Sequence, residues 1–117
     1  MDYQSYLGKW ENCNKHSKGV KTFQFLEKEH SLWVSVEGVT GGLVTGKWGL
    51  STCKPYAATT DSKIPIAFQA NYHIPEFDAY LQFNVNKRLI ILATLIDFKT
   101  EPDKSGVFIR EFYSLAK

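Results

Sequence analysis

The residues of this chain that could act as nucleophiles, acids, bases or metal ligands do not gather into a motif. His16, His30 and His73 fall in three separate polar turns. Ser17 is the one serine beside a histidine, and it has neither a nucleophile elbow nor an orienting carboxylate close in sequence. We therefore expect solvated histidines, assign no catalytic residue, and predict that the protein is not an enzyme.

Acidic residues and cysteines offer no clearer chemistry. Glu37, Glu76 and Asp78 could be placed as acid and base in many folds, but charged residues at outward strand positions usually form a solvated face. Cys13 and Cys53 are the only cysteines; they stay thiols in a reducing compartment and could pair in an oxidising one. Neither has a C-x-x-C partner, so we expect no metal site and no cofactor.

Length and composition favour one soluble, globular domain over residues 1–117. The chain is 44% hydrophobic and 15% aromatic, well above what a disordered segment carries. Its 14 basic and 12 acidic residues are dispersed, which excludes a basic stripe for nucleic acid and a lipid-binding cluster. No signal peptide is visible at the N-terminus, and the longest apolar run, Leu89 to Ile96, is too short to span a membrane. We expect a cytoplasmic protein.

Period-two alternation of apolar and polar residues dominates the pattern and predicts strands. Eight strands are expected, at residues 7–13, 20–27, 32–37, 43–53, 66–73, 77–85, 88–98 and 107–115. Residues 54–63 form the longest polar stretch and are expected to be a mobile loop near an open end. Short strands joined in sequence by turns favour an all-β, eight-stranded up-and-down antiparallel barrel, with a Greek-key sandwich as the alternative.

Gly8-Lys9-Trp10 on the first strand and Arg110 on the last resemble the lipocalin and wider calycin superfamily, which opens with G-x-W and closes with a basic residue. The resemblance implies a structural lock in which the Arg110 side chain packs across the ring of Trp10. A guanidinium over an indole contributes roughly 0.5 to 2 kcal/mol. Trp10-Glu11-Asn12 and Trp48-Gly49 also look like elements of small uncharacterised bacterial barrels of the avidin and lipocalin type.

The expected function is the non-catalytic binding of a small, mainly apolar molecule in the barrel or at its mouth. The residues expected to line such a site are Phe25, Val36, Trp48, Phe68, Tyr72 and Phe83. Because an eight-stranded barrel is just wide enough for side chains or one small ligand, these large residues could instead fill it. The alternative is then a structural or protein-interaction module with a filled core. A third interpretation uses Trp33 and Tyr80 as exposed rings on a glycan- or protein-binding surface.

The strand at residues 88–98 is apolar on both faces, so something must cover its outer side. We expect a homodimer that buries one apolar patch on the last two strands, because soluble monomers seldom expose such a patch. The expected interface residues are Leu89, Ile91, Leu95, Val107, Ile109 and Tyr113. A sandwich that buries this strand on both faces is the alternative.

Overall fold

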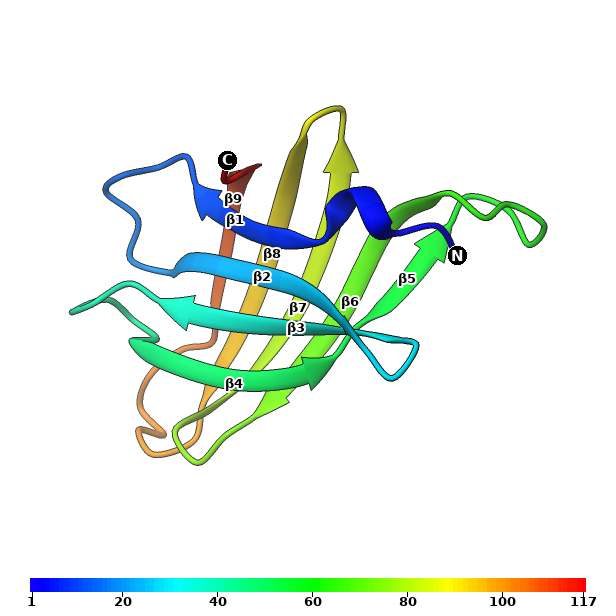
Figure 1. The fold of residues 1–117 in the computed structure, drawn as a ribbon. Helices are drawn as coiled ribbons and strands as arrows, with labels where there is room; N and C mark the ends of the chain where they lie inside the picture. Colours follow the sequence, from blue (N-terminus) through cyan, green and yellow to red (C-terminus); the bar gives the residue numbers. More distant parts are fainter.

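The computed structural model describes all 117 residues and consists of nine antiparallel strands and one short 3₁₀ helix, η1 (Figure 1). The elements are η1 (Gln4–Tyr6), β1 (Gly8–Asn12), β2 (Val20–Lys28), β3 (Ser31–Gly38), β4 (Gly46–Thr52), β5 (Lys54–Ala57), β6 (Pro65–His73), β7 (Phe77–Asn86), β8 (Leu89–Phe98) and β9 (Val107–Leu115). No helix in the chain has the length and apolar character needed to cross a membrane. The expected all-β architecture is confirmed, with nine strands in place of eight.

All nine strands form one sheet in the order β4-β3-β2-β1-β9-β8-β7-β6-β5. Two meanders are thus joined where the first strand pairs with the last. In Figure 1 the strands β1 to β4 lie across the front, and β6 to β9 cross behind them at a steep angle. The sheet coils on itself as an up-and-down barrel that is nearly closed, which is compatible with a calycin-like fold.

Closure depends on one bent strand that changes its partner. β4 pairs with β3, and after Cys53 the chain continues as β5 and pairs with β6. Residues 54–57 are therefore a strand and not part of the loop that the sequence predicted. The sequence pattern did not predict this strand, because its polar and small residues show no apolar alternation. Its conformation is set by pairing with a partner strand across the barrel.

A seam without backbone pairing remains between β4 and the end of β6. Side chains bridge it instead: the Ser51 hydroxyl donates to the Asn71 carbonyl oxygen at 2.9 Å. The Tyr72 hydroxyl lies 2.9 Å from the carbonyl oxygens of both Val34 and Gly49, and burial raises the pKa of this hydroxyl, which keeps it protonated as a donor. These contacts hold β6 against β3 and β4 where backbone pairing is missing.

The expected lock between Trp10 and Arg110 is wrong. Trp10 is buried, stacks on Phe23, and donates from its indole N–H to the Tyr6 carbonyl oxygen at 2.9 Å. Arg110 is exposed on the outer side of β9. The sequence placed β9 one residue out of phase, because its two faces are similarly aromatic and only the location of Glu111 distinguishes them.

Candidate functional site

The barrel interior is filled by aromatic rings. The six residues expected to line a ligand site are all buried. At one end Phe25 lies 4.8 Å from Phe68 and 5.1 Å from Phe83, measured between ring centroids. At the other end Trp48 packs edge-on against Tyr72 at 5.2 Å. The sequence thus identified the inward residues, and the structure brings them together as a packed core.

Helix η1 closes the end of the barrel at Phe68. Tyr6 meets Phe68 edge-on at 5.5 Å and stacks on Trp10 at 6.5 Å. The Tyr3 hydroxyl donates to a Glu27 carboxylate oxygen at 2.8 Å, and the Asp2 N–H donates to the Lys63 carbonyl oxygen. The N-terminal segment therefore packs as a lid over this end.

The opposite end carries a hollow of about 280 Å³ between two loops. Phe77 and Phe98 line it from one side, and Leu43 and Val44 line it from the other. Phe77 in turn packs on Trp48 at 5.0 Å, so the hollow lies directly above the filled core. None of the six expected residues lines this hollow, and two of them, Val36 and Phe68, border other open hollows on the surface.

A polar network centred on Glu111 holds the first loop against β9. Ser17 and Asn14 donate to the two carboxylate oxygens of Glu111 at 2.6 and 2.9 Å, and Asn12 donates at 3.0 Å. The buried Tyr113 hydroxyl donates to the Val20 carbonyl oxygen at 2.7 Å. Sequence reasoning missed this network because it joins residues that are almost a full chain length apart. Its partners are satisfied by each other, which marks it as structural.

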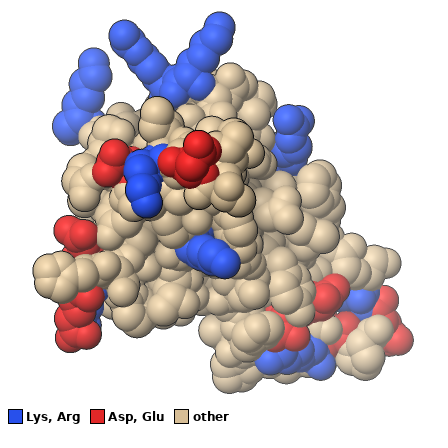
Figure 2. All heavy atoms as spheres, turned by 90° about the vertical axis from the view of Figure 1, so that its right-hand side faces the viewer, with Lys and Arg blue, Asp and Glu red and all other residues tan.

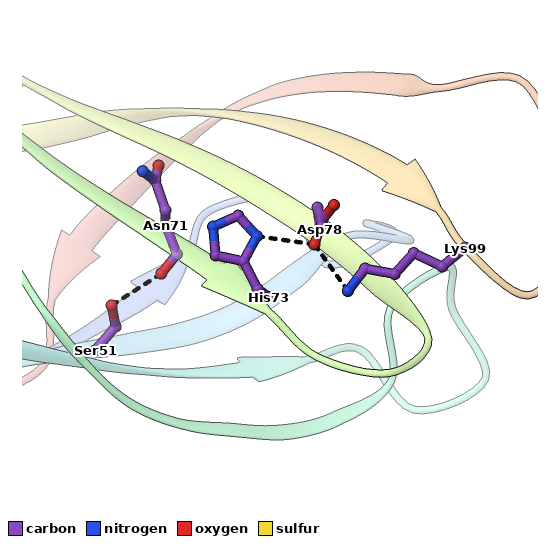
Figure 3. Close-up of polar contacts among 5 residues, drawn as sticks. All are labelled: Ser51, Asn71, His73, Asp78 and Lys99. Atoms are coloured by element: carbon purple, nitrogen blue, oxygen red, sulfur yellow. Dashed lines mark hydrogen bonds and ion pairs between the residues drawn. The ribbon is translucent and has the colours of Figure 1, made fainter.

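An exposed triplet lies near the seam (Figure 3). His73 Nδ1 lies 2.8 Å from a carboxylate oxygen of Asp78, and Lys99 Nζ lies 3.0 Å from the same oxygen. These contacts, led by the His73 hydrogen bond, hold the pKa of the Asp78 carboxyl below its usual value. Ser51, the nearest hydroxyl drawn in Figure 3, donates to the Asn71 carbonyl oxygen and not to the His73 ring. The nucleophile-to-base contact that hydrolytic catalysis requires is missing from this cluster.

The two cysteines are free thiols in different environments. Cys13 is exposed beside β9, and Cys53 is buried where β4 becomes β5. Burial raises the pKa of the Cys53 thiol to about 12, against a smaller opposing effect of a hydrogen bond with the Gln69 backbone. Cys53 is therefore an inert core residue. The chain contains no cluster of His, Cys, Asp and Glu side chains suited to a metal.

The outer side of β6 to β9 carries a charge-poor surface, which we call the β6–β9 face and which is bordered at one end by a charged row of His73, Asp78 and Asp97. Cross-strand pairing aligns its residues in four rows. The rows are Asn71-Tyr80-Leu95-Phe108, Gln69-Gln82-Ala93-Arg110, Ala67-Asn84-Ile91-Phe112 and Asn86-Leu89-Ser114. Arg110 is the only charged residue among them. Phe108 is 60% exposed, and Leu95 and Phe112 are about 40% exposed, so large apolar side chains meet solvent here.

The opposite half of the barrel has an ordinary surface. Lys9, Glu11, Glu37 and Lys47 project from the outer side of β1 to β4, between polar neighbours. Figure 2 shows charges of both signs scattered over the side that carries β5 and the N-terminus, with neutral surface between them. The four rows of the β6–β9 face are therefore poorer in charge than the outer side of β1 to β4, and charged residues border them only beyond the first row and at the Lys87–Arg88 turn.

The expected interface residues divide between the two sides of the sheet. Leu89, Ile91 and Leu95 lie on the outer side of β8, as the sequence predicted. Val107, Ile109 and Tyr113 face inward, and Tyr113 is fully buried, which corrects their assignment. Phe108, Arg110 and Phe112 take their place, because the one-residue phase error exchanges the two faces of β9.

The fold and these surfaces define an all-β antiparallel barrel with a packed interior. Comparison with models of protein families, with curated proteins and with solved structures finds no match for this chain.

Proposed function

We propose that this chain is a non-catalytic binding protein, and that it recognises a protein surface through the β6–β9 face. The observation that carries the proposal is the exposure of Tyr80, Leu95, Phe108 and Phe112 on a surface with one charged residue. Protein interfaces are enriched in aromatic residues and arginine at their centres and are depleted of lysine and acidic residues. The packed interior supports the same conclusion, since it leaves the outer surface as the place for recognition.

A photoreactive phenylalanine analogue placed at Phe108 tests this function in cells that make the protein. We expect covalent conjugates with another polypeptide chain after irradiation, because this side chain projects into solvent from the start of β9. The matched control places the same analogue at Leu50, which is 47% exposed on the outer side of β4. Conjugates at neither position, or equally at both, would show that the face has no recognition role.

A second candidate function is the binding of a small, mainly apolar molecule at the mouth of the barrel. The hollow favours it, because Leu43, Val44, Phe77 and Phe98 supply an apolar part, beside the charged side chains of Glu76, Glu101 and Lys104. A hydrophobic reporter dye should then bind saturably, and Leu43→Asp should abolish the signal while leaving the fold intact. Binding that survives Leu43→Asp but disappears in Phe108→Ser would place the dye on the β6–β9 face and reject the mouth site.

Calycin ancestry would suit either function. The nearly closed up-and-down barrel and Gly8-Lys9-Trp10 on its first strand support such ancestry. The outward Arg110 departs from the expected pattern. The chemical proposals above rest on the surfaces and not on that ancestry.

A further inference from the structure

We infer that the partner bound by the β6–β9 face is a second copy of this chain, in a two-fold symmetric homodimer. This inference rests on the proposed function and names its partner. The expectation of a dimer used the outer sides of both β8 and β9, and the structure replaces the expected β9 residues with Phe108, Arg110 and Phe112.

The size of the face fits a weak dimer. The four strands of the face are spaced about 4.8 Å apart. Its four rows are two residues apart along strands that rise about 3.4 Å per residue. Together these spacings give the face an area of roughly 500 Å² per copy. Two copies would bury roughly 1,000 Å², the lower limit for a specific interface. We therefore expect association that depends on concentration over the micromolar range.

The lack of charge favours a second copy over an acidic or basic partner. Within the four rows Arg110 is the only charged group, and the amides of Gln69, Gln82 and Asn84 present both donors and acceptors. A surface of this kind can face itself without bringing like charges together, provided that the two arginines are kept apart.

The strand register supplies that condition. A two-fold axis perpendicular to the strands and located between the second and third rows places each strand of the β6–β9 face over the same strand of the second copy, in the opposite direction. Residues of the second row then face residues of the third, so that Arg110 faces the second copy's Phe112. Leu95 in the first row faces Leu89 in the fourth. The two guanidinium groups are offset along β9, and the end of the face at Asp97 lies over the Lys87–Arg88 turn of the second copy.

Sedimentation velocity of the purified protein, from about 1 to about 200 µM, tests the inference. We expect a monomer–dimer equilibrium in the native protein. Leu95→Glu should weaken the dimer by at least about 100-fold, because it places a carboxylate on a surface that the dimer desolvates. Leu50→Glu is the matched control and should leave the equilibrium unchanged, since this leucine has similar exposure, 47% against 42%, on the opposite half of the barrel.

Monomers throughout this concentration range would overturn the dimer, as would equal effects of the two variants. The proposed function has a separate outcome: conjugates at position 108 that contain a different polypeptide would retain the recognition face while rejecting the second copy as its partner. Circular dichroism of both variants checks that they are folded, and because both leucines are exposed, neither substitution removes a core contact.

Discussion

Two neighbouring residues on β9 have opposite roles, which sequence chemistry alone did not separate. Glu111 points toward the first loop and accepts hydrogen bonds from Asn12, Asn14 and Ser17, whereas Arg110 points to solvent. A charged residue on a strand with aromatics on both sides could belong to either face. The partners of Glu111 decide the phase, and they come from the other end of the chain.

Replacing these two residues should give sharply different stabilities. Glu111→Ala should lower the free energy of unfolding by about 1 to 3 kcal/mol, because it leaves the buried Ser17 hydroxyl without its acceptor. Arg110→Ala should change it by no more than about 0.5 kcal/mol. Urea denaturation of both variants measures the difference. Equal losses would contradict the orientation of β9 described above.

Trp10 should contribute to stability independently of Arg110. Trp10→Ala removes a buried ring that stacks on Phe23 and should cost about 3 to 5 kcal/mol. Because the two side chains do not meet, the double variant should show the sum of the single effects to within about 0.5 kcal/mol. A larger coupling energy in the double-mutant cycle would show that the Trp10 and Arg110 side chains interact after all.

Acid should weaken the His73–Asp78–Lys99 triplet. The pKa of Asp78 is lower in the folded than in the unfolded chain, so the stabilisation is present above the unfolded value near 4 and is lost as the pH falls through the folded value. Asp78→Asn should therefore reduce the dependence of the unfolding midpoint on pH in the acid range. An unchanged acid dependence in this variant would show that the triplet contributes nothing to stability.

At the scale of elements, the turn between β2 and β3 is under backbone strain. Glu29 and His30 have φ values of 54° and 64°, the left-handed conformation that a two-residue hairpin requires and that glycine adopts most easily. His30→Gly should stabilise the protein by about 0.5 to 1 kcal/mol in thermal or chemical denaturation. Ser31→Gly, in the extended strand next to it, should destabilise the protein, and a loss in both variants would contradict the strain.

β5 divides the expected loop into two parts with different dynamics. Its residues 54–57 pair with β6, so their hydrogen-bonded amides should exchange slowly, whereas residues 58–63 should exchange fast. Hydrogen exchange with mass spectrometry distinguishes the two segments. Fast exchange over the whole of residues 54–63 would show that β5 is not stably paired and that this stretch behaves as the loop predicted from the sequence.

The alternation of apolar and polar residues was enough to predict most strands. It also predicted which side chains of β2, β3 and β7 point inward, because each of these strands has one clearly apolar face, such as the face of β2 that carries Phe23 and Phe25. It failed where tertiary pairing decides. β5 takes its conformation from β6, β9 takes its phase from Glu111, and Leu50 lies outside because Gly49 interrupts the alternation at a register shift of β4. The face made by four strands depended on that phase, so its arginine and two phenylalanines could not be assigned from sequence.

At the scale of the whole molecule, self-association should raise thermal stability. A dimer that forms only from folded chains is favoured at high concentration, so the melting temperature of the native protein should rise with concentration. Leu95→Glu should remove this dependence, because it places a charge on an exposed apolar position of the β6–β9 face. Scanning calorimetry at several concentrations measures both proteins, and a constant melting temperature for the native chain would contradict association.

The pairing of β1 with β9 has a consequence for how the chain folds. Each meander can form from hairpins between strands that follow one another, but the two are joined by only three residue pairs, including Trp10 with Leu115, drawn from opposite ends of the sequence. Loop-closure entropy opposes that contact until the meanders are in place. The docking of β1 on β9 should therefore be the late step of folding, and substitutions confined to this ladder should accelerate unfolding while leaving the folding rate almost unchanged.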